Sequence, residues 1–250
     1  MNKGFLCVFL LIFLGDFAKG QSNQLLEEAR ALERQYNTVQ AVLKYEQSLK
    51  ENPNQLLVIV RLVEIYCFEL DEVKDDLKKS EQLNKAKELL QIAKSIDSTS
   101  PDYLYSQTTY LGKLIEISPV KEKAQITKSI KQILDEALTK DPNHVKCLYS
   151  LANWNQEVAS LNPAVKAAMK VIFGGLPPAS LEMAIELHQK ARKLNPGFLA
   201  NNFELALLYK KTNQPSRAVE VLEAQIKLPT KTKEEFEIKN KSKLLLQSFQ

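Results

Sequence analysis

A degenerate internal repeat constrains the fold of this chain more than any other feature of its sequence. Two small or apolar residues lie seven positions apart, and an Asn-Pro or Asp-Pro pair begins four residues after the second of them. The pattern occurs at Ala41, Ser48 and Asn52-Pro53, at Ile130, Ala137 and Asp141-Pro142, and at Ala184, Ala191 and Asn195-Pro196. Ala86 and Ala93 share the spacing, but Pro101 follows three residues late. Such repetition predicts an array of helical hairpins that bury their apolar faces by stacking on one another, and it favours binding over catalysis.

The first twenty residues have the organisation of a secretory signal peptide. Lys3 precedes an unbroken apolar run over Phe5–Leu14, and the small-x-small triplet Ala18-Lys19-Gly20 follows. The run is ten residues long, whereas a membrane-spanning helix needs about twenty. We therefore expect cleavage before Gln21 and export, with periplasmic residence and secretion both open. The lysine, asparagine and isoleucine usage favours a bacterial envelope protein, and membrane association is expected only through an uncleaved signal segment.

Composition and charge limit the remaining 230 residues to one class of protein. The chain has only seven glycines and lacks alternating apolar runs bounded by turn residues, which argues against a sheet. We expect one domain over residues 21–250, an all-α, tetratricopeptide-like helical-hairpin solenoid with one inserted helix. The net charge of +4 falls to +3 without the first twenty residues, and most lysines stand beside glutamates. This pattern is typical of solvated helix faces and predicts no nucleic-acid partner.

Prolines predict where the helices begin. Six of the ten follow Asn, Ser or Asp, and we expect a helix start at each of Pro53, Pro101, Pro119, Pro142, Pro163 and Pro196. The expected helices cover residues 22–34, 38–51, 54–70, 80–96, 102–117, 119–140, 143–160, 163–173, 178–194, 198–212, 215–227 and 232–248. The last opens with Thr232 and Glu235, which form a capping-box pattern.

Two segments exceed the length of a regular repeat of about 34 residues. We expect an exposed, lengthened turn over Asp71–Lys79. The second excess is the apolar helix Pro163–Phe173, which is followed by Gly174-Gly175-Leu176-Pro177-Pro178. Glycine at the end of a helix and two prolines after it predict a sharp corner.

Cysteine and histidine positions give no sign of catalysis. Cys67 and Cys147 would enter an oxidising compartment, but they lie about two repeats apart, so buried thiols are favoured over a disulfide. His188 is expected in the core between helices, and His144 at a surface turn. Neither histidine has metal-ligand spacing, and no nucleophile elbow, zinc motif or nucleotide loop occurs. We expect neither enzymatic activity nor a cofactor or metal.

The concave side of such a solenoid is lined by the first helix of each hairpin and predicts a groove for a peptide or protein partner. If Val145 and Leu199 begin two such helices, the groove is lined by Tyr149, Asn153, Gln156, Phe203, Leu207 and Lys210. The alternative is that Tyr149 and Phe203 are ordinary core residues. Loss of partner capture without loss of helicity would be expected when Asn153 and Lys210 are replaced.

From about residue 141 to 246, the order of features resembles that of the regulator of microtubule dynamics protein family. The matching features are the Trp154 helix running into Glu157–Leu161, the inserted helix Ala167–Phe173, the corner Leu176-Pro177-Pro178, Asn195-Pro196-Gly197-Phe198, Leu205 to Tyr209, and Leu228-Pro229 before Thr232–Glu235. The resemblance implies a non-enzymatic helical-repeat protein with links to microtubules and organelle contact sites, and lipid binding in some members. Carriage of a lipid or other apolar molecule, with the inserted helix roofing a pocket, is therefore the alternative function. A signal peptide would separate this chain from cytoplasmic microtubules.

Overall fold

The computed structural model describes residues 20–70 and 73–249, apart from the side chains of Asp76, Ala168, Ile172 and Phe173. The predicted signal peptide therefore lies almost wholly outside the described residues. A first helix covers residues 20–34. It is followed by α2 (Thr38–Glu51), α3 (Leu56–Glu69), α4 (Asp76–Asp97), α5 (Pro101–Ile117), α6 (Val120–Lys140), α7 (Val145–Ser160), α8 (Pro163–Phe173), α9 (Leu181–Leu194), α10 (Leu199–Lys211), α11 (Pro215–Gln225) and α12 (Lys233–Gln247). The described part of the chain contains no strand, and the predicted all-α class is confirmed.

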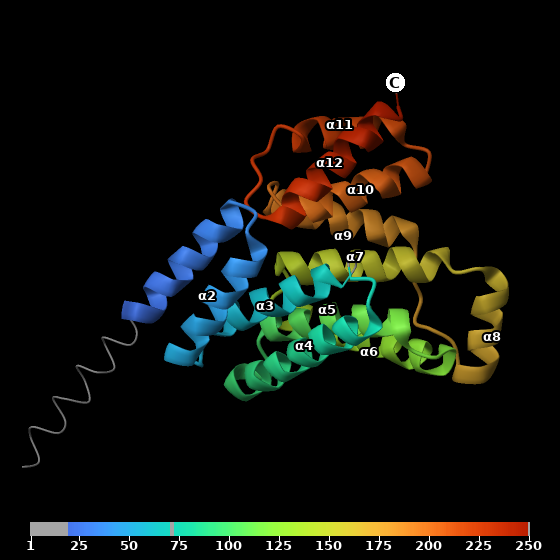
Figure 1. The fold of residues 1–250 in the computed structure, drawn as a ribbon. Helices are drawn as coiled ribbons and strands as arrows, with labels where there is room; N and C mark the ends of the chain where they lie inside the picture. Colours follow the sequence, from blue (N-terminus) through green and yellow to red (C-terminus); the bar gives the residue numbers. More distant parts are fainter. Residues whose placement is uncertain (1–19, 71–72, 250) are drawn as a thin grey trace, which may run out of the picture.

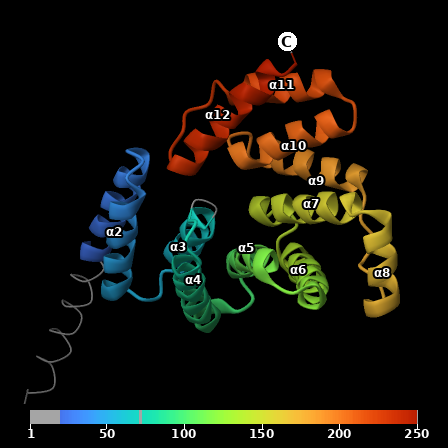
Figure 2. The same ribbon diagram turned by 45° about the vertical axis from the view of Figure 1, so that its right-hand side comes forward.

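The helices pack as consecutive hairpins (Figure 1). α3 pairs with α4, α5 with α6, α7 with α9, and α10 with α11, while α12 covers α10 and α11. The first helices of these hairpins, α3, α5, α7 and α10, also contact one another in that order. Figure 2 shows the pairs following a curve around one side of the molecule. The predicted solenoid is therefore confirmed, with α8 inserted between the two helices of one hairpin.

The residues of the internal repeat form the contacts between helices. Every member of the pairs seven positions apart is buried, at Ala41, Ser48, Ala86, Ala93, Ile130, Ala137, Ala184 and Ala191. Small side chains at these positions let the backbones of neighbouring helices approach closely. The Leu-Tyr pairs four residues apart in the first helices, such as Leu205 and Tyr209, are buried as well.

Prolines of the repeat lie in turns, and the expected helix starts at Pro53, Pro142 and Pro196 were wrong by three residues. Each follows an Asn or Asp that caps the preceding helix through its backbone N–H. The Asp141 carboxylate then accepts the N–H of Asn143 at 2.9 Å, and the Asn195 amide oxygen accepts the N–H of Gly197 at 3.1 Å. Proline fixes φ within this turn, so its ring favours the bend and not the first helical residue. Pro101 and Pro163 do begin helices, and Pro119 is the cap of α6.

Two further boundaries differ from the sequence-based expectation. α4 begins at Asp76 because the carboxylate of Asp75 accepts the N–H of Leu77 at 2.9 Å, so part of the expected turn is helical. α9 begins at Leu181, where the Ser180 hydroxyl accepts the N–H of Met183. Both boundaries follow local caps, which set a helix start more firmly than the positions of nearby prolines.

The inserted helix α8 has the predicted bounds and stands apart from the packed pairs (Figure 2). Gly174 and Gly175 end it with φ of 70° and 82°, in the region that favours glycine. Among the side chains of α8 that the structure describes, Met169 is buried and Val171 is 87% exposed. No helix among the described residues combines the length and apolar character that crossing a membrane requires.

The helix over residues 20–34 and α2 form the first hairpin, and the curve brings this hairpin beside the start of α12 (Figure 1). The hydroxyl groups of Tyr36 and Thr230 are 2.6 Å apart, and the rings of Tyr36 and Phe236 are 5.2 Å apart. Arg61 of α3 bonds to Glu234 of α12 at 2.9 Å. We call these five residues the closure contact. It joins segments that are separated by most of the described chain.

Candidate functional site

Two charged side chains interrupt the middle of the mainly apolar helix α3. Arg61 and Glu64 are one turn apart in the segment LLVIVRLVEIYCFE, and Arg61 joins three carboxylates. Its Nε donates to Glu33 Oε1 at 2.8 Å, and its Nη2 donates to Glu234 Oε1 at 2.9 Å. Burial disfavours the charged guanidinium, but the attraction of Glu234, Glu33 and Glu64 outweighs it and raises the pKa of Arg61. Arg61 therefore stays charged and connects three segments.

The first hairpin is tied to the same group. The hydroxyl of Tyr45 in α2 donates to Glu33 Oε2 at 2.6 Å, and Glu33 itself is only 8% exposed. Burial and this hydrogen bond raise the pKa of Tyr45. Glu33 is thus a buried carboxylate whose two oxygens are held by separate helices.

The polar contacts continue from α3 to α7. Lys146 of α7 bonds to Glu64 and lies over the ring of Tyr105 in α5, with its Nζ 5.2 Å from the ring centre. Burial, together with the negative charge of Glu64, raises the pKa of Tyr105 well above its usual range. An ion pair and a cation–π contact therefore link the consecutive first helices α3, α5 and α7.

The polar contacts extend from α7 to α10. Gln156 Nε2 donates to Glu204 Oε2 at 3.5 Å. Burial raises the pKa of Glu204, and the repulsion of Glu157 acts in the same direction. We call the set of residues linking the first helices the polar track, which consists of Glu33, Arg61, Glu64, Lys146, Gln156 and Glu204.

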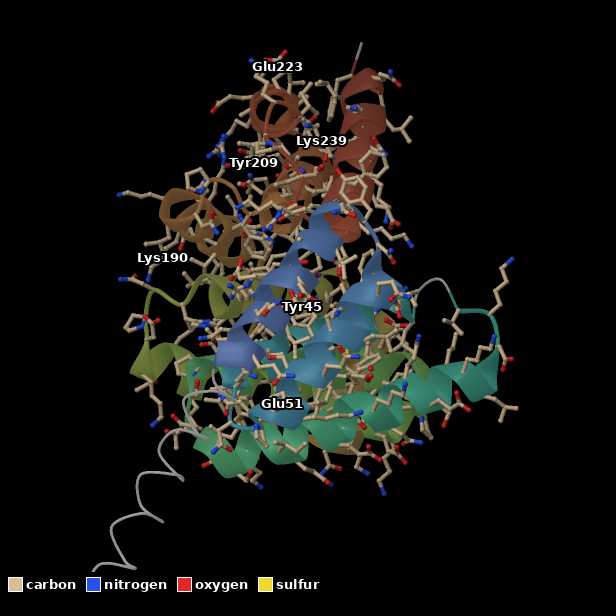
Figure 3. All side chains as sticks on the ribbon, turned by 60° about the vertical axis from the view of Figure 1, so that its left-hand side comes forward. Tyr45, Glu51, Lys190, Tyr209, Glu223 and Lys239 are labelled. Carbon is tan, nitrogen blue, oxygen red and sulfur yellow. The ribbon has the colours of Figure 1, made fainter. Side chains whose placement is uncertain are left out.

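A cavity of about 510 Å³ opens where the first hairpin meets α3. Its walls are mainly apolar, with track residues at the edge, and its lining consists of Leu26, Arg30, Glu33, Tyr45, Gln55, Leu56, Leu57, Val58 and Arg61. Figure 3 views the molecule from this side, with Tyr45 near its centre. An apolar hollow beside fixed charges suits a partner's hydrophobic side chain.

The three predicted residues of α7 lie close together. The ring of Tyr149 packs edge-on against Phe198 at 5.0 Å and lies 6.0 Å from the ring of His188. Burial, with the charge of Glu204, raises the pKa of Tyr149 to about 12, against the effect of a hydrogen bond with Asn153. The side-chain oxygens of Asn153 and Gln156 are buried and accept no hydrogen bond from the described residues.

The three predicted residues of α10 lie beside the C-terminal helix. Phe203 packs against the same small core as Leu245 of α12, and Leu207 is half-buried. The ammonium of Lys210 donates to the Ser248 hydroxyl at 2.9 Å and lies over the ring of Phe249. α10 instead faces α7 through Glu204 and through Lys211, which bonds to Ser160. Phe203 and Lys210 therefore contact the C-terminal segment, whereas Gln156 contacts α10 through Glu204.

Histidine and cysteine positions agree with the predictions except at His144. His188 is fully buried, and burial lowers its pKa to about 4. Cys67 and Cys147 are buried thiols, and burial raises the pKa of Cys147 to about 12. His144 is more than a surface turn residue, because its Nδ1 accepts the N–H of Cys147 and its Nε2 lies 3.2 Å from Asp102 Oδ1. The hydrogen bond from His144 lowers the pKa of Asp102.

Sequence reasoning missed most of the polar track. Arg61, Glu64 and Glu204 interrupt apolar helices, and a charged residue in such a helix is a usable signal because burying it requires a partner. Glu33 and Lys146 give a weaker signal, since each lies within the first or last two residues of its helix, where charged side chains are common. Among the described residues, no cluster of three or more His, Cys, Asp or Glu side chains could hold a metal ion.

Known proteins match this chain along most of its length. The model of the family described as regulator of microtubule dynamics protein 1-3 matches residues 25–250. Regulator of microtubule dynamics protein 1 of Caenorhabditis elegans is 23% identical over 184 residues, which cover 73% of this chain and 80% of that protein. Regulator of microtubule dynamics protein 3 of Xenopus laevis is 27% identical over 127 residues, half of this chain and 27% of that protein. The chain thus spans about a quarter of this longer relative. These relatives are animal proteins and give no support to the periplasm.

Solved structures confirm the type of repeat. A thermophilic tetratricopeptide-repeat protein of Thermus thermophilus superposes with a TM-score of 0.61 at 14% sequence identity. The match covers 91% of this chain and 98% of that chain. The fold is therefore a tetratricopeptide-like solenoid, as the spacing of small residues predicted.

Proposed function

Since the chain belongs to the regulator of microtubule dynamics protein 1-3 family, we propose that it is a non-catalytic scaffold that holds a protein partner against the polar track. Tetratricopeptide-like solenoids are generally scaffolds that bind proteins, and their successive first helices offer a continuous surface. The partner would lie as an extended peptide across α3, α7 and α10, with an apolar side chain in the 510 Å³ cavity.

One observation carries this proposal. Asn153 Oδ1 and Gln156 Oε1 are one helical turn apart on α7, and both are buried acceptors without a hydrogen bond from the described residues. An unmatched buried acceptor costs roughly 1–3 kcal/mol. If the two half-buried amide side chains turn outward, two backbone N–H groups of an extended peptide would satisfy these oxygens, which supports peptide binding at this place.

The test is peptide selection on the full chain. A displayed library of random peptides is selected for binding, and the enriched peptides are measured by fluorescence anisotropy. Asn153→Ala combined with Gln156→Ala should weaken binding about tenfold or more, since two hydrogen bonds are lost. Lys87→Ala on α4 is the matched control because its side chain is exposed and lies outside the polar track. Equal binding by both variants would contradict the proposal.

The names of the relatives suggest a cytoskeletal partner. We propose that peptides from tubulin or from microtubule-associated proteins belong to the recognised class. Co-sedimentation of the full chain with purified microtubules tests this directly, and the Asn153 and Gln156 variant again serves as the comparison. Sedimentation that the variant leaves unchanged would assign any microtubule contact to another surface.

Export remains a proposal that a separate measurement decides. If residues 1–20 act as a signal peptide, N-terminal sequencing of the protein recovered from its host should begin at Gln21. A chain that begins at Met1 would show that the segment is not cleaved and would contradict release after export. The two described cavities give no specific support to the lipid-carrier alternative, since neither of them is lined by a residue of α8. Phe173, whose packing would test that alternative, has its side chain outside the described residues.

A further inference from the structure

A second cavity lies between the second helices of two consecutive hairpins, α9 and α11, with α10 beneath them. Its volume is about 450 Å³, and it is lined by Gln189, Arg192, Lys193, Pro196, Tyr209, Arg217, Glu220 and Val221. Figure 3 labels Tyr209 between Lys190 of α9 and Glu223 of α11. The lining holds three cationic side chains and one carboxylate, which leaves a net of two positive charges.

The floor of this cavity is held in a fixed geometry. Tyr209 is 3% exposed, and its hydroxyl oxygen accepts a hydrogen bond from Gln189 Nε2 at 2.6 Å. The hydroxyl proton therefore stays available for a ligand. The guanidinium of Arg217 lies 4.3 Å from the centre of the Tyr209 ring, and its Nη1 donates to Gln214 Oε1 at 2.7 Å. Stacking and this bond fix the planar fork while its other N–H groups remain for a ligand.

Glu220, the carboxylate in the lining, neutralises little of the positive charge of the cavity. Glu220 approaches Arg192 only to 3.9 Å, and its side chain is 74% exposed. An exposed ion pair at this distance contributes little. The positive charge of the cavity is therefore largely available to an anion from solution.

We propose that this cavity binds the dianionic phosphate group of a phosphate monoester. Two guanidinium groups offer paired N–H donors that match phosphate oxygens, and the Lys193 ammonium and the Tyr209 hydroxyl complete the donor set. Two net positive charges balance a phosphate that carries close to two negative charges at pH 7. The group can come from a small phosphorylated metabolite or from a phosphorylated side chain of a partner protein. The proposal does not depend on peptide binding at the polar track.

Isothermal titration calorimetry on the full chain tests this with O-phosphoserine, a short peptide that contains phosphoserine, and inorganic phosphate, with serine as the comparison that lacks the phosphate group. Both phosphoserine probes should bind, and serine should not. Arg217→Gln and Arg192→Gln should each weaken binding about tenfold or more, because a charge-assisted hydrogen bond is lost. Lys87→Gln on α4, outside the cavity, should leave the affinity unchanged.

Glu220→Gln makes the test independent of folding defects, because removing the carboxylate should tighten phosphate binding by about fivefold. Damage to the fold cannot produce such a gain. Tighter binding of the peptide than of inorganic phosphate identifies a phosphorylated protein as the source, and equal affinity identifies a free phosphate compound. Absence of binding for all phosphate probes, or an affinity that Glu220→Gln and Arg217→Gln leave unchanged, overturns the proposal.

Discussion

At the scale of single residues, His188 and Arg61 are both bonded to side chains from other helices. Asn201 Oδ1 lies 2.9 Å from His188 Nδ1, and Asn201 Nδ2 donates to the His188 carbonyl at 3.0 Å. Arg61 is held by carboxylates from three segments. Such groups specify one packing arrangement, but they also make stability sensitive to pH and to substitution.

His188 should make the protein less stable in mild acid. Its pKa is about 4 in the folded chain, against a usual 6.5, so the unfolded chain binds the proton first as the pH falls. The free energy of unfolding should decrease between pH 6.5 and pH 4, by about 2 kcal/mol between pH 7 and pH 5. Urea denaturation of the protein and of His188→Gln at both pH values checks this, since only the histidine chain should show this part of the loss. Parallel pH dependence would contradict it.

Replacing Arg61 should cost far more stability than replacing an exposed arginine. Arg61→Met leaves Glu33, Glu64 and Glu234 without their shared cation, and breaking such a buried pair costs about 3–5 kcal/mol. Arg30→Met is the matched control, because Arg30 pairs with Glu27 on the surface and should cost at most about 1 kcal/mol. The midpoints of urea unfolding compare the two variants, and similar midpoints would mean that Arg61 does not organise its site.

At the scale of helices and turns, the sequence predicted the existence and order of the elements well, because buried small residues at a spacing of seven report directly on helix packing. Boundaries were less predictable where side-chain caps decide them, as at Asp75 and Ser180. The polar track was only half predictable for a related reason. Gln156 lies on a recognisable helix face, whereas the pairing of Glu33 with Arg61 depends on how the helix over residues 20–34 packs against α3.

The Asn-Pro and Asp-Pro turns should each contribute measurably to stability. Asp141→Ala removes the acceptor for the N–H of Asn143 and should cost about 1 kcal/mol. Asp135→Ala, on the exposed face of the same helix, removes only the pair with Lys131 and should cost about half as much or less. Thermal unfolding followed by circular dichroism separates these values. Equal losses would show that the turn side chain does not stabilise the junction.

At the scale of the whole molecule, the closure contact turns a one-directional array into a curve whose ends support each other. Open solenoids have contacts between neighbouring repeats only, so their stability is close to a sum of local terms. Here Tyr36 contacts Thr230, 194 residues later. The first hairpin and α12 should therefore unfold together.

Opening the closure contact should enlarge the molecule without unfolding its helices. Tyr36→Ala combined with Glu234→Gln removes the ring contact and the negative charge of one partner of Arg61. Small-angle X-ray scattering should then give a larger radius of gyration, with an unchanged circular dichroism spectrum. Leu244→Ala, at an exposed residue of the same C-terminal helix, is the control and should keep the original dimensions. An unchanged radius in the double variant would mean that packing elsewhere sets the curvature.

The closure contact also has a consequence for folding during synthesis. A ribosome adds roughly 5–20 residues per second, so Thr230 follows Tyr36, 194 residues earlier, by about 10–40 s. During that interval the first hairpin exists without its distant partner, and Glu33 shares Arg61 with Glu64 alone. Of all the hairpins in a nascent chain, the first therefore waits longest for its full set of contacts.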